Sequence, residues 1–395
     1  MLSKMPLDAG AMIIVERLHS AGYEVNVVGG AVRNHILGIP VSDIDMTTSA
    51  TPDVTASLFS DFRVIETGIK HGTVTILIEK EPFEVTTYRT DGSYLDNRHP
   101  ESVCFTPNLS EDLARRDFTI NAIAYNPYDG FTDLFDGISD IGNRIIRAVG
   151  DPETRFREDA LRILRAIRFA SVLGFTVEPK TALAVRQTAQ LLNNVSRERI
   201  FSEWIKLIGG MSAYEIISNY RDVVSVAIPQ LVDIRLPEKK LFDFADKTAR
   251  MLSLFYLSTA DPVSSFDLAM TALRTDNKTR KMGTDALKII KDYNLNSLVG
   301  VLLAVYRFDT ESVSTAIDLA YTVKKIDSDE YAAGKTALSN AKIKSISDLA
   351  VGGRDMIALG FRGQDIGLTL DRIAVAVIEG KCQNDRESIF QYLKK

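Results

Sequence analysis

The stretch VVGGAVRNHILGIPVSDIDMTT, residues 27–48, decides the fold of the first part of the chain. A valine-rich run enters Gly29-Gly30, and a short helix is expected over 31–38. Two glycines between a strand and a helix let backbone amides approach a phosphate closely, and the helix dipole favours the anion. Arg33 falls on the first turn of that helix, where its guanidinium can reach the same anion. The stretch therefore predicts a phosphate-binding turn.

Two aspartates follow in the same stretch. Asp43 and Asp45 are separated by one residue within 42–48, a segment whose alternation predicts a strand. Side chains at i and i+2 of a strand point to one face, so both carboxylates are expected to project together. Such carboxylates repel each other unless a hard cation lies between them, and oxygen ligation suits Mg²⁺. The pair is a candidate metal site, where divalent ions would activate an attacking hydroxyl and stabilise a leaving pyrophosphate.

Strand-like and helix-like pieces alternate through the first part of the chain, which predicts an α/β head around a small mixed sheet. Further strands are expected at 71–80, 83–89 and 121–127. Beyond the head, apolar residues recur at helical spacing to the last residues. We therefore expect an all-helical remainder. The predicted divisions are a head at 1–145, a neck at 146–210, a body at 211–290 and a tail at 291–395.

Composition excludes several classes of protein. Apolar residues make up 45% and charged residues 25% of the 395 residues, a balance typical of soluble globular proteins. With two cysteines, Cys104 and Cys382, neither a disulfide framework nor a cysteine-rich zinc module is expected. The four histidines lack metal-ligand spacing. No signal peptide and no membrane span are evident, so we expect a cytoplasmic protein with no membrane partner.

Gly-Gly-x-x-Arg followed by Asp-x-Asp resembles the first signature of the polymerase-β-like nucleotidyltransferases. The form found here is similar to the class II tRNA nucleotidyltransferases, which include the bacterial CCA-adding enzymes and poly(A) polymerases. EDLARRDFTINA, residues 111–122, matches the second signature of that family. The resemblance implies a polymerase-β-like nucleotidyltransferase sheet with flanking helices, and it implies that Asp43 and Asp45 are catalytic. The implied triphosphate contacts are Gly29, Gly30, Arg33 and Arg116.

FREDALRILRAIRFA, residues 156–170, predicts a basic helix in the neck. Its polar residues recur every third position, so neighbours lie side by side. An aspartate accepts from the exocyclic amino group that cytosine and adenine share, and an arginine donates to the adjacent ring nitrogen. Uracil and guanine reverse part of that pattern. The resemblance assigns base reading to Glu-Asp-x-x-Arg, which implies Asp159 and Arg162 as readers and Arg165 and Arg168 as supporting nucleotide contacts.

Weaker features complete the prediction. Glu84, on the expected strand 83–89, is a candidate third carboxylate. The loop-like segment 89–109, with Arg98-His99 where many relatives have paired arginines, resembles a loop of the enzymes that add CCA or A. Ser196 is expected to cap a helix on which Arg199 and Glu203 pair. Basic groups of the helical remainder could meet RNA phosphates. These groups are Lys239-Lys240, Lys278 with Arg280-Lys281, Lys324-Lys325, and Lys342 with Lys344.

The resemblance predicts an enzyme that adds C, C and A to the 3′ end of tRNA from CTP and ATP, with Mg²⁺ and without a nucleic-acid template. The expected partners are tRNA, CTP and ATP, and the oligomeric state is left open. An A-adding enzyme working with a separate CC-adding enzyme, or a poly(A) polymerase, would carry the same motifs. A catalytically inactive RNA-binding protein is a further alternative, which the intact Asp43 and Asp45 disfavour.

Overall fold

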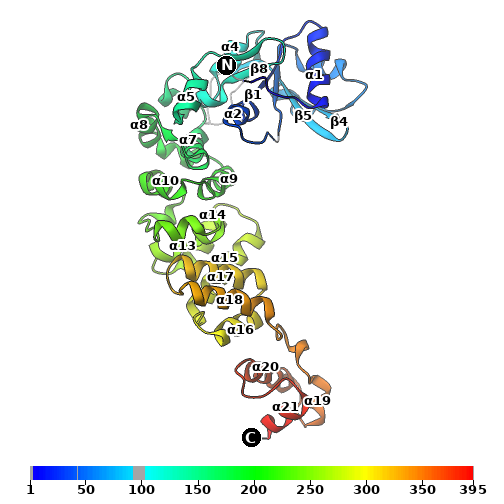
Figure 1. The fold of residues 1–395 in the computed structure, drawn as a ribbon, viewed down its shortest axis with the longest axis vertical. Coiled ribbons are helices and arrows are strands. Elements are labelled where there is room, and N and C mark those ends of the chain that lie inside the picture. Colours follow the sequence, from blue (N-terminus) through cyan, green and yellow to red (C-terminus); the bar gives the residue numbers. More distant parts are fainter. Residues whose placement is uncertain (1–2, 42, 92–102, 395) are drawn as a thin grey trace. The chain divides into compact units, whose positions relative to one another are not determined.

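A computed structural model describes residues 3–41, 43–91 and 103–394 of the chain. Its contacts divide the chain into two compact units, Met1–Ile216 and Ile217–Lys395. The strands of the described residues all lie in the first unit, and the regular structure of the second unit is helical (Figure 1). The predicted fold class, an α/β head followed by helices, is confirmed. None of the described helices combines the length and the apolar character needed to cross a bilayer.

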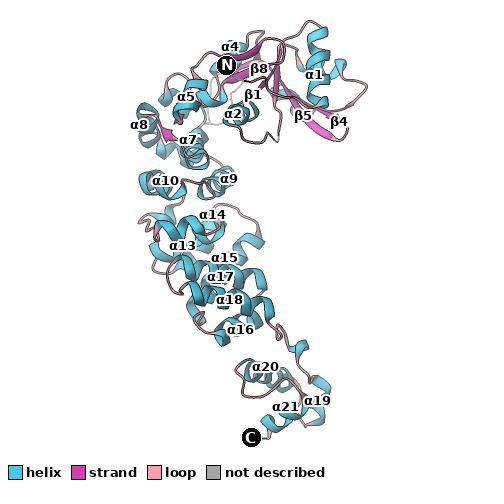
Figure 2. Ribbon diagram, in the orientation of Figure 1, coloured by secondary structure: helices cyan, strands magenta, loops and turns pink. Residues whose placement is uncertain are grey.

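A seven-stranded mixed sheet forms the centre of the head, as Figure 2 shows in magenta. The strand order is β3-β4-β5-β2-β1-β8-β9, and the neighbours are antiparallel except for β2 and β5. The strands expected at 71–80, 83–89 and 121–127 are confirmed as β4, β5 and β8. The bounds are β1 Val25–Val28, β2 Met46–Thr48, β3 Arg63–Ile65, β4 Thr73–Ile78, β5 Glu81–Thr87, β8 Ile123–Asn126 and β9 Gly130–Asp133.

The register of β1 explains why β2 is shorter than the segment predicted from the sequence. The amide of Val28, the last residue of β1, donates to the carbonyl of Asp45 at 3.0 Å. Gly29 then turns the chain into helix α2 (Gly30–Leu37), so the ladder between the two strands ends before it reaches the first aspartate. The strand therefore begins at Met46, and both aspartates precede it. The prediction of a strand beneath both carboxylates is wrong in this respect.

Helices flank the sheet, as their amphipathic sequences require. Helix α1 is capped by the Asp8 carboxylate, which accepts from the Ala11 amide at 2.7 Å. The other head helices are short, and α2 matches the helix expected over 31–38. The bounds are α1 Ala9–Ser20, α3 Pro52–Leu58, α4 Leu109–Ala114 and α5 Gly137–Asn143, with 3₁₀ turns at Ile69–His71 and Thr119–Asn121.

The segment 89–109 is not a loop at its two ends. Strand β6 (Arg89–Asp91) pairs with β7 (Val103–Phe105), because the Tyr88 carbonyl accepts from the Thr106 amide at 3.0 Å and brings the two ends together. The middle of the segment, including Arg98-His99, lies outside the described residues.

The neck helix predicted over 156–170 is broken. Helix α6 (Pro152–Glu158) ends where Asp159 adopts extended backbone, with φ −128° and ψ 104°, and α7 (Leu161–Leu173) begins after it. A two-stranded parallel ladder joins β10 (Ile145–Ile146) to β11 (Thr176–Val177). The chain continues through α8 Pro179–Gln187, a 3₁₀ turn at Ala189–Asn194, α9 Arg197–Ile208 and α10 Ala213–Asn219.

The second unit is built from helices packed around apolar cores. Phe255 and Phe266 meet edge to face, with ring centroids 5.2 Å apart, in one core. Another core gathers around Met356 and Ile373. The helices are α11 Arg221–Ala227, α12 Lys239–Phe244, α13 Lys247–Ser258, α14 Pro262–Ala272, α15 Asn277–Asp292, α16 Leu298–Arg307, α17 Thr310–Thr322, α18 Ser328–Asn340, α19 Gly353–Ala358, α20 Gln364–Ile378 and α21 Arg386–Leu393, with 3₁₀ turns at Pro229–Leu231 and Ile346–Asp348.

Candidate active site

The turn between β1 and α2 brings four of the predicted site residues together. Gly29 has φ 71° and ψ −129°, a conformation that side-chain-bearing residues rarely adopt. A Cβ atom built on Gly29 would lie 3.6 Å from Nη1 of Arg116, and one on Gly30 would lie 3.6 Å from Nη2 of Arg33. Two guanidinium groups therefore lie over the start of α2, where backbone amides and the helix dipole already favour an anion. The geometry suits a nucleotide triphosphate.

Arg33 is held in place by neutral partners. Its Nη1 donates to Oδ1 of Asn121 at 2.6 Å, and its Nε and Nη2 donate to Oδ1 of Asn34. Burial, followed by the charge of Arg168, lowers the pKa of Arg33 to about 10, so the group stays protonated at neutral pH. A buried cation whose bonded partners are uncharged amides keeps most of its charge available. Arg33 is therefore electrostatically poised for an anion.

Asp43 and Asp45 lie close enough to influence each other, although they stand before β2 rather than along it. The surrounding protein raises the pKa of the Asp45 carboxyl, and the charge of Asp43 raises it further, while Arg116 opposes the shift. Both side chains remain accessible to solvent. Two neighbouring, accessible carboxylates with mutual repulsion supply the oxygen donors that a hard divalent cation needs. The residues present therefore fit the predicted metal.

Glu84 lies on the strand next to the aspartates. β2 and β5 are parallel, with Met46 opposite Val85, so one further step of that register places Glu84 beside Asp45. The Glu84 side chain is exposed. No group of three His, Cys, Asp or Glu side chains in metal-binding proximity occurs among the described residues. The register brings Glu84 near the pair, and its carboxylate does not close a three-carboxylate cluster in this conformation.

Asp112, on α4, is a buried carboxylate that the sequence analysis missed. Its Oδ1 accepts from Arg115 at 2.7 Å and its Oδ2 accepts from Arg116 at 3.0 Å. The hydroxyl of Thr47, on β2, donates to Oδ2 at 3.3 Å. Burial alone would raise the pKa of Asp112, but Arg116 and Arg115 lower it below its usual value. Asp112 thus links Arg116 to the strand that follows Asp43 and Asp45.

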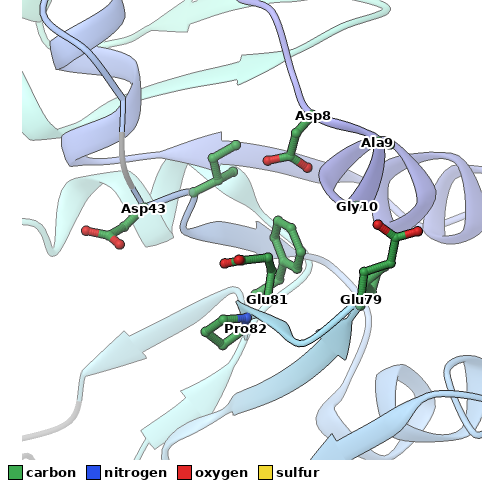
Figure 3. A pocket seen from close by; sticks show the side chains of 10 residues that line it. Asp8, Ala9, Gly10, Asp43, Glu79, Glu81 and Pro82 are labelled. Carbon is green, nitrogen blue, oxygen red and sulfur yellow. The ribbon is translucent and has the colours of Figure 1, made fainter.

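An acidic hollow of about 420 Å³ lies beside Asp43. Figure 3 shows the carboxylates that border it, which come from the start of α1, the segment before β2 and the β4–β5 turn. They belong to Asp8, Asp43, Glu79 and Glu81. Such a surface repels phosphate, so a triphosphate is expected on the side of Asp45 that carries Arg116.

The sequence predicted that Asp159 lies beside Arg162 on one helix face, and this prediction is wrong. In the break between α6 and α7, its Oδ1 accepts from the Leu161 amide at 3.0 Å, and its Oδ2 accepts from Nη2 of Arg199 at 3.0 Å. These two contacts hold the Asp159 carboxylate within the break. Arg199 belongs to α9, so a distant segment fixes this predicted base reader.

Arg162 is almost fully buried, with 8% of its surface exposed. Its Nη1 donates to Oε2 of Glu158 at 2.8 Å, and its Nη2 donates to the carbonyl of Arg115 at 2.7 Å. The second contact ties the neck to the double-arginine segment of the head. Arg162 and Asp159 each have protein partners in this conformation, so reading a base requires their remaining donors and acceptors or an exchange of partners.

Arg165 and Arg168 are also anchored by carboxylates. Arg165 donates from Nε and Nη2 to Oδ2 of Asp117, at 2.7 and 2.5 Å, and Arg168 donates to Oε2 of Glu203 at 2.7 Å. Burial would raise the pKa of Asp117, but the charge of Arg165 and hydrogen bonds from Asn121 and Arg165 lower it to about 2.

The expected pair between Arg199 and Glu203 is wrong. Both side chains lie on one face of α9, and each reaches across to a partner of opposite charge, Asp159 for Arg199 and Arg168 for Glu203. Ser196 is the residue before α9, but its hydroxyl makes no capping hydrogen bond. The spacing i, i+4 identified the shared face but not the partners.

Three family models match successive parts of the chain. Residues 25–147 match the poly A polymerase head domain. Residues 174–222 match the probable RNA and SrmB-binding site of polymerase A, and residues 242–393 match the putative tRNA nucleotidyltransferase domain 2. A CCA-adding enzyme of Lactobacillus helveticus is 36% identical to the chain, with 97% of the chain and 96% of the relative covered. The chain belongs to the CCA-adding enzyme family.

Other members of the CCA-adding enzyme family match the chain over most of their length. The enzyme of Lactobacillus gasseri is 36% identical over 97% of the chain and 96% of its own length. The crystal structure of the Bacillus stearothermophilus CCA-adding enzyme in complex with CTP is 31% identical, with a TM-score of 0.80 over 97% of this chain and 96% of that one. A Thermotoga maritima CCA-adding enzyme, 20% identical with a TM-score of 0.71 over 98% and 96% of the two chains, shares the fold.

The resemblance inferred from the sequence is therefore confirmed, and the chain is a nucleotidyltransferase. Enzymes of this family use a divalent metal ion. The family signatures identified the glycine turn and the arginines but not their supports, Asp112, Arg199 and Glu203. The spacing offered one signal, because Asp112 stands three residues before Arg115 and four before Arg116, as helical ion pairs do.

Proposed function

We propose that the chain adds C, C and A to the 3′ end of tRNA, taking CTP and ATP as substrates with Mg²⁺ and releasing pyrophosphate. One observation carries the proposal: the Arg115-Arg116 segment lies near the glycine turn, influences Asp45 and accepts a hydrogen bond from Arg162. Arg116 lies over the glycine turn and acts on Asp45, while the carbonyl of Arg115 accepts from Arg162 of the neck. This arrangement supports a site that combines triphosphate binding, metal binding and base selection.

Asp43 and Asp45 hold the metal in this proposal, and Mg²⁺ is the choice because both ligands are oxygens. When bound, the ion supplies activation of the tRNA 3′-hydroxyl and neutralises charge on the leaving pyrophosphate. Glu84, next to Asp45 by register, is the proposed third carboxylate. The catalytic pair is accessible, as a pair that receives a macromolecular 3′ end must be.

The remaining residues bind and select the nucleotide. Arg33 and Arg116 contact the triphosphate above Gly29 and Gly30. Asp159 accepts from the amino group of cytosine or adenine, and Arg162 donates to the ring nitrogen beside it. Arg165 and Arg168 contribute positive charge around the nucleotide while Asp117 and Glu203 keep them oriented. The proposed divisions of the helical remainder are a neck, body and tail at 146–210, 211–290 and 291–395, after a head at 1–145, and the tail is the proposed tRNA-binding part.

The test is nucleotide addition by the purified chain to three tRNA transcripts, one ending before CCA, one ending in C-C and one complete. We expect CTP alone to extend the first by two residues, ATP alone to extend only the second by one, and both nucleotides to produce CCA on the first. An A-adding enzyme would use ATP alone and ignore CTP, and a poly(A) polymerase would extend the complete tRNA. No incorporation with any nucleotide, under conditions where Mg²⁺ is present, would contradict the proposal.

A further inference from the structure

Arg199 is the charged group that holds the predicted base reader Asp159. It reaches across from α9 and gives one N–H, from Nη2, to the Asp159 carboxylate at 3.0 Å. The Leu161 amide holds the other oxygen at 3.0 Å. Each carboxylate oxygen has two lone pairs, so these bonds fix the direction of the carboxylate without using its whole accepting capacity. Asp159 can therefore be oriented and still accept from a base.

The environment of Arg199 is that of an anchored rather than a free surface cation. Its side chain is 29% exposed and that of Asp159 is 19% exposed. Nη1 of Arg199 is buried and has no hydrogen-bond partner among the described residues. One i+4 step along α9, Glu203 anchors Arg168 in the same way. One face of α9 thus holds two charged side chains, Arg168 on α7 and Asp159 in the break before it.

We propose that Arg199 is a positioning residue that sets nucleotide selectivity through Asp159. This inference rests on the proposed function. An aspartate beside a helix break has freedom at χ1 and χ2 and at its own backbone, so its acceptor must be fixed by a partner to discriminate an amino group from a carbonyl. Cytosine presents an amino group where uracil presents a carbonyl oxygen, which a correctly directed carboxylate repels. Without Arg199, the carboxylate loses its direction and the difference between CTP and UTP shrinks.

The test compares Arg199→Gln and Arg199→Lys with the unaltered chain, measuring kcat and KM separately for CTP, ATP and UTP on tRNA lacking CCA. We expect Arg199→Gln to raise KM for CTP and ATP and to reduce the preference for CTP over UTP by about tenfold, the loss expected for one oriented base contact. Arg199→Lys keeps the positive charge but not the forked guanidinium donors, so its preference for CTP over UTP should lie between those of Arg199→Gln and the unaltered chain. Arg157→Gln removes an exposed neck ion pair with Glu153 and serves as the control.

A double-mutant cycle separates positioning from a structural link between helices. In chains that carry Asp159→Asn, adding Arg199→Gln should change the CTP/UTP preference no further, because Arg199 acts through Asp159. Equal selectivity of the Arg199→Gln and unaltered chains overturns the inference, even if turnover or thermal stability falls. If Arg199→Gln does not fold, an unchanged preference in Arg199→Lys overturns it equally. Failure of the unaltered chain to add C and A would count against the proposed function instead.

Discussion

Positive side chains are held in different ways in the two units of the chain. In the first unit, three guanidinium groups surround the ring of Phe169, with Cζ atoms 5.1 Å from its centroid for Arg33, 5.3 Å for Arg165 and 3.4 Å for Arg168. Two of them are also fixed by buried carboxylates. Stacking and planar hydrogen bonds give each guanidinium one direction.

In the second unit, the basic groups expected to meet RNA phosphates are mostly exposed and paired with acids. Lys278 pairs with Glu311 at 3.0 Å, and Lys281 pairs with Asp285 at 2.6 Å. Lys324 pairs with Glu238, a contact between two exposed side chains. The number of basic residues in a sequence therefore does not measure the electrostatic field at a surface, because acids on the same helix or on other segments face them. An anion-binding site is indicated instead by cations that have a fixed direction and whose charge is not fully balanced by acids, such as the three arginines around Phe169.

The largest expected effect comes from the proposed metal site of the first unit. Asp43→Ala should reduce nucleotide addition by on the order of 10³-fold or more, because one of the two oxygen ligands is lost. The melting temperature should not change, since Asp43 is exposed. Incorporation of labelled CTP into tRNA, together with thermal unfolding, measures both. Asp243→Ala, which removes an exposed aspartate from its pair with Lys239 in the second unit, is the matched control and should keep full activity.

Two buried carboxylates, one in each unit, test whether the effect on nucleotide binding depends on burial alone or on the position of the carboxylate. Asp112→Asn should raise KM for CTP and ATP about tenfold, because Arg116 loses a charged anchor, and should lower stability by roughly 1–3 kcal/mol. Asp285→Asn, which removes a buried partner of Lys281, should lower stability but leave KM unchanged. Steady-state kinetics of the two variants measure KM, and urea unfolding measures their stability. An equal rise of KM in both would contradict a specific role for Asp112.

The low pKa of Asp117 gives the first unit a pH dependence. The carboxyl has a pKa of about 2 in the fold and an ordinary value of 3.8, so the folded state binds fewer protons. Its contribution, roughly 2 kcal/mol, is complete above about pH 4 and is lost as the pH falls toward 2. Fluorescence of Trp204, the single tryptophan, reports unfolding of this unit. Asp117→Asn should destabilise the unit at pH 6 and by roughly half as much at pH 3, which lies between the two pKa values; equal losses at both pH values would argue against this ion pair.

The smallest effect is expected at the second unit's surface pairs. Lys278→Ala removes an ammonium group that is 77% exposed and already faces Glu311. KM for tRNA should change by less than about twofold and the melting temperature by about 1 °C at most, because exposed ion pairs contribute little. A tenfold weaker binding of tRNA would show that this lysine exchanges its acid for a phosphate, and would remove the contrast drawn between the two units.

Much of the head could be predicted from the sequence, because its elements are encoded locally. The valines before Gly29 and the turn residues after 31–38 are sufficient to predict β1 and α2 from the local sequence. The same holds for the motifs: a glycine pair, an arginine and two aspartates sit close in sequence, and their proximity in space follows from one strand, one turn and one helix.

The features that escaped prediction depend on partners far away in the sequence. The apolar spacing across 156–170 continues through Asp159, so the pattern favours one helix, and the break is visible only when Arg199 reaches the carboxylate from α9. Asp112 likewise has a helical signal toward Arg116, but its contact with Thr47 spans 65 positions. Local propensity gives no information on such contacts.

The bond between Asp117 and Arg165 also limits how this enzyme can be divided. The buried carboxylate precedes β8, and the half-buried guanidinium belongs to α7. A fragment cut near residue 150 would separate Asp117 from its counter-ion and expose the surface on which the two meet, even though every strand of the main sheet would be present. A cut after α10, close to the division at Ile216, would keep both partners of this bond in one fragment.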